Sequence, residues 1–176
     1  MKKERIISTI LIFMLCFLTH FIYDIFPCTL TSIFFPVNES IWEHMKMLFT
    51  TILFYHVLEA IYFNIKKIKY DNFWIAALIS SIISIPIYLV IFLPIYYNIG
   101  ENMLVTLIIL LITILIIEYI NYKILEAKMI PYGSIIAMLA TIISYITFAY
   151  LTYNPPKIDI FFDTENEKYG INDYII

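Results

Sequence analysis

The sequence predicts an all-α protein, a polytopic transmembrane bundle of about five helices with a short extracellular C-terminal tail. The chain has 176 residues, of which 62% are hydrophobic and only 14% are charged, whereas soluble domains are nearer to half apolar and a quarter charged. Its mean hydropathy is +0.87. Several apolar runs reach the roughly 20 residues that a helix needs to cross a bilayer. We therefore expect a helical bundle over residues 1–154 and an extracytoplasmic tail over residues 155–176.

The composition also restricts the partners and cofactors. The formal net charge is −3 and no basic cluster carries interleaved aromatic residues, so nucleic acid is not expected as a partner. The only two cysteines, Cys16 and Cys28, suggest neither a disulfide framework nor a cysteine-rich metal site. The lipid bilayer is the one partner that the sequence identifies. It names no protein partner and establishes no cofactor.

The first helix is predicted over residues 6–23. Lys2, Lys3 and Arg5 precede this apolar run as they would in a secretion signal, but no small-x-small cleavage site follows it. We therefore expect an uncleaved transmembrane helix. The connector 24–37 contains two prolines and an apolar segment too short to cross, which is typical of a segment at the membrane surface.

The second helix is predicted to begin at Asn38 or Ser40 and to end near Ile65. Ser40 and Glu43 fit a capping box, in which the Ser oxygen accepts a hydrogen bond from one free backbone amide. The Glu side chain accepts a hydrogen bond from another. Asn38 is a competing N-cap. The lysines directly after Ile65 suit a helix C-terminus, where cations are favoured.

Three further helices are predicted over residues 72–97, 103–122 and 131–153. Pro86 lies inside the first of them and should kink it, because proline removes one backbone hydrogen bond. Pro131 suits the first position of the last helix, where its missing N–H costs nothing.

The tail differs in kind from the bundle. Its partly alternating apolar residues predict a short hairpin or an extended strand on the membrane surface. A calcium loop needs several oxygen ligands at fixed spacing, and that spacing is absent here, so a solvated acidic turn is favoured. The acidic side chains of the tail are Asp159, Asp163, Glu165 and Glu167.

The distribution of basic residues predicts the orientation. With five crossings, eight of the eleven basic residues fall on the side of the N-terminus: Lys2, Lys3, Arg5, Lys66, Lys67, Lys69, Lys123 and Lys128. The positive-inside rule therefore places the N-terminus in the cytoplasm and the tail outside the plasma membrane.

A candidate site lies at the predicted outer ends of the first two helices. His20 and Asp24 are four residues apart and share a helix face. The connector is short, so both should lie near Glu43 and His44. His20, Asp24 and His44 are then candidate ligands for a divalent metal such as zinc, with Glu43 as the candidate catalytic residue that activates water.

Each of these residues also has a structural interpretation, which we keep open. Glu39 and Glu43 complement a helix N-terminus, and Glu43 completes the capping box. Asp24 marks a helix end, and the two histidines suit hydrogen-bonded packing. The spacing does not match an HExxH metalloprotease motif.

Three ionisable residues lie deeper in the apolar segments, namely His56, Glu59 and Glu118. Long lysine side chains can extend along apolar surface toward a charged partner, so we expect the two glutamates to pair with nearby lysines. The lysines in reach are Lys66, Lys67 and Lys123. The alternative is a proton path, because ionisable groups at membrane depth are functional candidates.

These observations leave three hypotheses for function. The first is a non-enzymatic pocket for a small ligand, lipid headgroup or partner, with candidate binding residues Asn38, Glu39, Ser40, Trp42, Glu43, His44 and Lys46. The second is a membrane-embedded metal-dependent hydrolase of lipid-like substrates. The third is a small proton-coupled transporter subunit, with Pro86 as hinge and His56 or Glu59 as proton carriers.

Two segments carry a resemblance to a known family. Residues 35–46 read Phe-Pro-Val-Asn-Glu-Ser-Ile-Trp-Glu-His-Met-Lys, and the tail reads Ile160-Phe161-Phe162-Asp163 followed by Tyr169-Gly170-Ile171. Together they resemble a family of small bacterial integral membrane proteins of unknown function, over essentially the whole chain. The resemblance implies location and architecture but no activity. It also implies that the two segments belong together, so we expect the tail to fold over the mouth between the first two helices.

Overall fold

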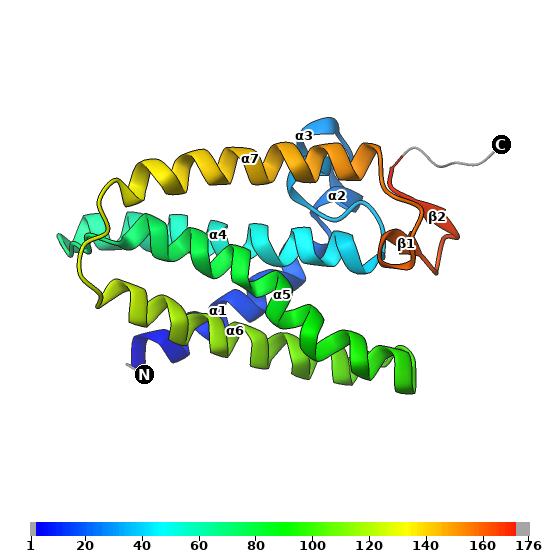
Figure 1. Cartoon of the computed structure of the whole chain (residues 1–176), viewed down its shortest axis with the longest axis horizontal. Helices are drawn as coiled ribbons and strands as arrows, with labels where there is room; N and C mark the ends of the chain where they lie inside the picture. Colours follow the sequence, from blue (N-terminus) through cyan, green and yellow to red (C-terminus); the bar gives the residue numbers. More distant parts are fainter. Residues whose placement is uncertain (1–2, 172–176) are drawn as a thin grey trace.

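The computed structural model describes residues 3–171 and contains the predicted all-α bundle (Figure 1). Among these residues five helices are long and apolar enough to cross a membrane, so the chain is a multi-pass membrane protein. The first span continues from α1 through the short α2 (Ile22–Ile25). Lys2 and residues 172–176, which entered the predictions above, lie outside the described part. The long helices are α1 (Lys3–His20), α4 (Ile41–Lys66), α5 (Phe73–Ile99), α6 (Met103–Leu125) and α7 (Gly133–Tyr153).

The bundle has two polar ends. The hairpin end is where α1 ends and α4 begins, beside the C-terminal hairpin; the amino-terminal end is the opposite one, where α1 begins (Figure 1). Helix α1 packs against α4 and α6, and α5 packs against α4, α6 and α7. The expected contact between the first two transmembrane helices is therefore confirmed. Which end faces the cytoplasm stays a prediction from the charges.

An apolar layer separates the two ends. Ile12, Leu48, Ile52 and Ile114 come from three helices and are completely buried in one cluster. The opposite faces of the helices expose large apolar side chains, as Val90 does with 74% of its surface. Exposed surfaces of this kind suit contact with lipid rather than with water.

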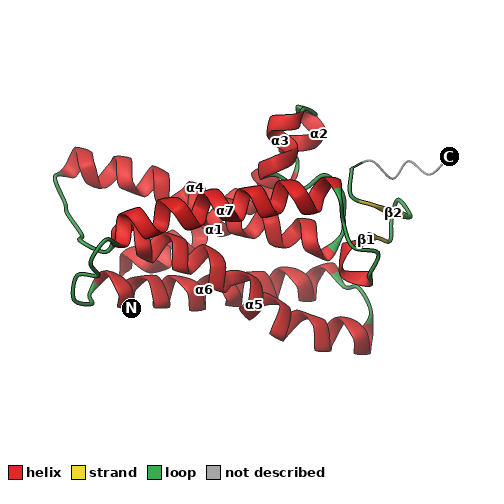
Figure 2. Ribbon diagram, turned by 45° about the horizontal axis from the view of Figure 1, so that its top comes forward, coloured by secondary structure: helices red, strands yellow, loops and turns green. Residues whose placement is uncertain are grey.

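Helix α5 crosses the bundle obliquely, and its axis changes direction along its length (Figures 1 and 2). Pro86 and Pro94 both lie inside it, and an interior proline bends a helix because it removes a backbone hydrogen bond. The end of α5 lies beside α6 and apart from α4. This divergence leaves room at the hairpin end.

The start of α4 confirms half of the predicted capping box. Ser40 is the N-cap, and its Oγ accepts a hydrogen bond from Glu43 N at 3.3 Å. The Glu43 side chain does not return to the Ser40 amide, because Asn38 Oδ1 already accepts that hydrogen bond at 2.9 Å. Instead Glu43 Oε2 accepts from Val37 N at 3.1 Å. Asn38 thus shapes the turn before α4 rather than capping the helix.

Asn72 fixes the loops at the amino-terminal end. Its side-chain amide donates to the carbonyls of Ile124, Ala127 and Lys128, and its oxygen accepts from Ile130 N at 2.8 Å. Helix α7 then begins two residues later than predicted. The reason is that Tyr132 takes the left-handed conformation and leaves Pro131 in the preceding turn.

The connector before α4 forms α2 and α3 (Thr29–Phe34), which project from the bundle beside α7 (Figure 2). The tail forms the 3₁₀ turn η1 (Asp159–Phe161) and the antiparallel strands β1 (Phe162–Asp163) and β2 (Lys168–Tyr169). The predicted hairpin is therefore confirmed.

The hairpin packs on the start of α4. Asn38 Nδ2 donates to the carbonyl of Gly170 at 3.2 Å, and the rings of Trp42 and Phe161 lie 4.9 Å apart. Gly170 has a φ of +57°, and a Cβ there would lie 2.5 Å from the carbonyl oxygen of Thr152. Only glycine fits this close approach without displacing its neighbour. The two segments that carried the family resemblance are thus in direct contact.

Candidate functional site

Three ligating side chains meet at the hairpin end. His20 ends α1, Glu39 lies in the turn before α4, and His44 lies in the first turn of α4. The two Nε2 atoms are 3.2 Å apart, and each lies 3.4 Å from Glu39 Oε2. These side chains are 23–34% exposed, so a solute can reach them. We call this group the His-Glu triad.

The spacing of the His-Glu triad matches a tetrahedral metal centre. Zinc binds nitrogen and oxygen ligands at about 2.0–2.2 Å, which places neighbouring ligand atoms of a tetrahedron about 3.3 Å apart. The three observed separations lie within 0.1 Å of that length. Two histidines and one glutamate form a set that binds catalytic zinc in other proteins and leaves the fourth position open.

The His44 ring is oriented by its own helix cap. Its Nδ1 lies 2.9 Å from the carbonyl oxygen of Ser40. A carbonyl oxygen only accepts, so Nδ1 carries the hydrogen and the neutral ring keeps its lone pair on Nε2. Metal-binding histidines generally have such an outer partner, which fixes the tautomer and the direction of the ring.

Glu39 is charged at neutral pH. The hydrogen bond from His20 holds the pKa of the Glu39 carboxyl below its ordinary value of 4.5, and the nearby His44 acts in the same direction, although partial burial opposes both. An ionised carboxylate beside two imidazoles is the form that a cation requires.

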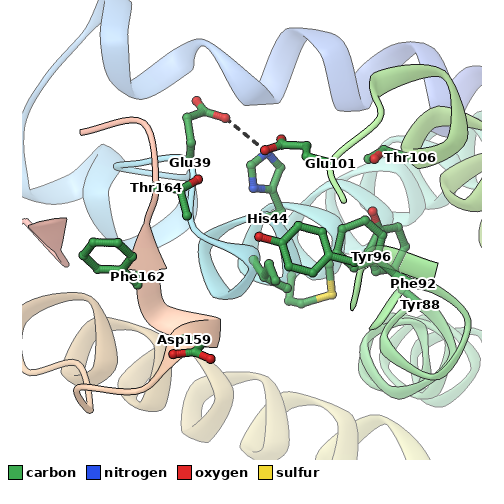
Figure 3. Close-up of a pocket in the computed structure, with 12 residues that line it drawn as sticks. Glu39, His44, Tyr88, Phe92, Tyr96, Glu101, Thr106, Asp159, Phe162 and Thr164 are labelled. Atoms are coloured by element: carbon green, nitrogen blue, oxygen red, sulfur yellow. Dashed lines mark ion pairs between the residues drawn. The ribbon is translucent and has the colours of Figure 1, made fainter. Parts of the chain in front are cut away.

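Two adjoining cavities share the side chains of Glu39 and His44, and Figure 3 shows the smaller of them. The smaller one, of about 70 Å³, lies under the hairpin and shares Glu39, His44 and Glu101 with the larger one. The larger one, of about 350 Å³, extends between α1, α4 and α6 toward the apolar layer, with apolar walls that include Phe17 and Leu107.

Carboxylates outnumber histidines around these cavities. Four carboxylates line them, and no lysine or arginine does so among the described residues. Three aromatic rings of α5 form a stacked row along one wall, with centroid separations of 5.1 and 5.3 Å. A negative cleft of this kind attracts cations. The carboxylates belong to Glu39, Glu101, Asp159 and Glu165, and the rings to Tyr88, Phe92 and Tyr96.

Two of the predicted metal ligands, His20 and His44, are brought together, whereas Asp24 is not part of the group. Asp24 lies exposed in α2, beyond the end of α1. Glu39 takes the third position because the turn shaped by Asn38 carries it back over α1. The only sign of this in the sequence is the closeness of Glu39 to His44 along the chain.

Glu43 lies away from both cavities, in a buried ion pair. Its Oε2 is 2.5 Å from Lys46 Nζ, and its Oε1 accepts from Thr152 Oγ1 at 3.0 Å. Lys46 Nζ also donates to the Ser32 carbonyl at 2.8 Å and to Thr152 Oγ1 at 2.9 Å. This fully bonded pair joins α4 to α3 and α7, and we assign it a structural role.

The remaining predicted binding residues support the hairpin end. Asn38 and Ser40 are buried in the turn before α4, and Trp42 packs between Phe148 of α7 and Phe161 of η1. Of the predicted set, only Glu39 and His44 line the cavities.

The expected pairing of Glu59 and Glu118 with lysines is wrong. Both glutamates bind the guanidinium of Arg5, and both lie within 3.4 Å of His56. Arg5 is 4% exposed and lies between the helices. The sequence does not indicate this contact, because Arg5 precedes the predicted first helix and was interpreted only as one of the charges that set the orientation.

A comparison with known families identifies the family of this chain. The model of a family of unknown function, DUF6512, matches residues 1–171, so the chain belongs to that family. No curated protein and no solved structure matches the chain. The resemblance seen in the sequence is confirmed.

Proposed function

We propose that this DUF6512 protein binds a divalent metal ion of the zinc class at the His-Glu triad. The metal would in turn hold the polar head of a lipid-like molecule whose apolar part lies in the larger cavity. One observation carries the proposal: three ligand atoms with tetrahedral spacing open directly into an apolar cavity.

The cavity supports the second half of the proposal. Its volume of about 350 Å³ is within the range of small-molecule sites, which are mostly apolar with a few polar groups that fix orientation. Here the polar groups are at the mouth and the apolar walls lie deeper in the bundle. An amphiphile fits this order of surfaces better than a wholly polar solute.

Metal analysis of the detergent-purified full chain tests the first half. We expect close to one zinc-class ion per chain in the wild type, and its loss in His44→Ala and Glu39→Gln. Asp24→Asn removes the neighbouring exposed acid, so this control should keep the metal. A wild type without metal after zinc is supplied, or full occupancy in His44→Ala, would refute the proposal.

An alkyl hydroxamate tests the second half, because its head chelates zinc and its chain is apolar. We expect calorimetry to show binding to the zinc-loaded protein and at least about tenfold weaker binding after chelation, since a coordinate bond contributes more than 1.4 kcal/mol. Leu107→Trp, which narrows the cavity, should weaken binding while keeping the metal. Equal binding by Leu107→Trp and wild type would mean that the alkyl chain of the hydroxamate lies outside the larger cavity.

Hydrolysis of the bound amphiphile is a second candidate function, favoured by the position of Glu101. This carboxylate lines both cavities together with Glu39 and His44 (Figure 3), and His20 joins them in the larger one. A metal-bound water is acidified, and Glu101 would accept its proton. The hydroxide would add to an ester or amide carbonyl, the carbon–heteroatom bond would break, and the leaving group would take the proton.

Release of fatty acid from ester and amide lipids tests this candidate. We expect turnover that needs metal and falls at least about 100-fold in Glu101→Gln, as losses of a general base do, with metal content unchanged. Binding of the hydroxamate without any turnover would leave the protein as a metal-dependent binding protein.

A further inference from the structure

A second polar centre lies at the amino-terminal end, on the other side of the apolar layer. Arg5 Nη1 donates to Asn121 Oδ1 at 3.2 Å and lies 3.3 Å from both Glu59 Oε2 and Glu118 Oε2; its second nitrogen also binds Glu59. His56 completes the group. We call these five residues, each at most 8% exposed, the Arg5 cluster.

The charges of the Arg5 cluster do not balance without an additional proton. Glu59 and Glu118 carry two negative charges when ionised and Arg5 carries one positive charge, so a neutral His56 leaves a net charge of −1. An uncompensated buried charge costs several kcal/mol. One proton on the His56 ring makes the cluster neutral.

The hydrogen bonds of His56 accommodate both protonation states. Nδ1 lies 3.0 Å from Glu59 Oε2, to which it donates in either state. Nε2 lies 3.3 Å from Asn121 Nδ2 and 3.4 Å from Glu118 Oε1. A neutral ring accepts from Asn121, whereas a protonated ring donates to Glu118. Glu118 Oε1 is buried and receives no other hydrogen bond from the described residues.

The other groups that contact His56 within residues 4–171 are uncharged. Tyr55 is its neighbour on α4, and its hydroxyl donates to Ser8 of α1 at 2.7 Å. On α5, Ser80 accepts from Asn121 at 3.2 Å, and the ring of Phe73 lies 6.2 Å from the imidazole. Among the described residues, the charged groups that face His56 are therefore Glu59 of α4 and Glu118 of α6, and both of these bind Arg5 of α1.

The cluster is connected to the surface at its own end of the bundle. A cavity of about 530 Å³ is lined by Arg5 and Glu59 together with Ser8 and Tyr55. Glu59 therefore contacts both this cavity and His56. The apolar layer described above lies between the cluster and the His-Glu triad.

We infer that the Arg5 cluster is a proton-binding site, in which the His56 ring takes up one proton from the amino-terminal cavity and exchanges Asn121 for Glu118 as the partner of Nε2. The proton adds to a lone pair, so no other reactant is consumed. The inference does not depend on the proposed metal site.

Nitrogen NMR of the full chain tests the inference. In His20→Gln/His44→Gln the only histidine is His56, so ¹⁵N-histidine labelling in detergent micelles reports on this ring alone. We expect both ring nitrogens to give protonated signals at neutral pH. A ring with one unprotonated nitrogen would overturn the inference, and this measurement needs no change within the cluster.

Removal of one carboxylate gives the second arm. Glu118→Gln in the same background leaves Glu59 and Arg5 balanced, so we expect the ring to become neutral at the same pH. Glu167→Gln, an exposed acid in the hairpin, is the matched control and should leave the ring protonated. A ring still protonated in a folded Glu118→Gln protein would contradict the charge argument. Because both triad histidines are absent, failure of the metal proposal cannot imitate either outcome.

Discussion

Loss of the Lys46 ammonium should destabilise the protein more than loss of the whole ion pair. The Lys46 side chain is completely buried and that of Glu43 is 2% exposed. Lys46→Met keeps the length of the side chain but leaves the Glu43 carboxylate buried without its cation. Removing one partner of a buried pair costs about 3–5 kcal/mol, which is roughly a 10²–10⁴-fold change in the unfolding equilibrium.

Glu43→Gln/Lys46→Met separates the charge effect from the lost contacts. The amide oxygen of Gln still accepts from Val37 N or from Thr152 Oγ1, so about one to two hydrogen bonds are lost, at roughly 1 kcal/mol each. We therefore expect the double variant to be more stable than Lys46→Met by at least about 1 kcal/mol, because no uncompensated charge remains.

Unfolding by SDS in mixed micelles, followed by circular dichroism, measures these differences. Wild type, both single variants and the double variant form a thermodynamic cycle, and the interaction energy of the pair is read from it. If the double variant loses as much as the sum of the two single variants, the two side chains act independently and the reasoning fails.

Three further predictions concern the hairpin and the loops. Burial opposes ionisation of Asp163, but hydrogen bonds from the Asn166 side chain and nearby backbone outweigh it and hold its pKa below the ordinary value of 3.8. The ionised Asp163 therefore stabilises the hairpin above pH 3.8, and this stability is lost as the pH falls through the lowered pKa. Trp42 fluorescence, measured in a Trp74→Phe background, should report the loss as a transition in acid. The same transition in Asp163→Asn would contradict this. Gly170→Ala should loosen the hairpin by about 1–3 kcal/mol, seen as faster proteolysis of the tail, and unchanged proteolysis would argue against the close approach. Asn72→Ala should lower the free energy of unfolding by about 1–3 kcal/mol, since it removes the hydrogen bonds of the Asn72 side chain to three backbone carbonyls and one backbone amide. A loss below 1 kcal/mol in the SDS assay would contradict that role.

The sequence predicts the helices well because crossing a bilayer imposes a length and a polarity on each segment. The short connector also placed His20 beside His44, because it leaves the first two crossings no alternative to packing together. The start of α7 was missed by two residues, since nothing in the sequence shows that Tyr132 takes a left-handed conformation.

Contacts between side chains distant in sequence were harder to predict. Glu59 and Glu118 have lysines near them along the chain, yet they bind Arg5, which is 54 and 113 residues away. The position of Glu39 depends on the turn that Asn38 builds with the hairpin. Both depend on how helices and tail meet in space, which hydropathy and spacing do not encode.

The apolar layer of Ile12, Leu48, Ile52 and Ile114 stands between two groups of ionisable side chains. These four side chains offer no hydrogen-bonding group, so we expect each group of ionisable side chains to exchange protons with the solution at its own end. In a cell that maintains different pH values on the two sides of its membrane, the His-Glu triad and the Arg5 cluster would each respond to the pH of a different compartment. Coupling between the two groups would then require movement of α1, α4 and α6, the helices that supply the apolar layer.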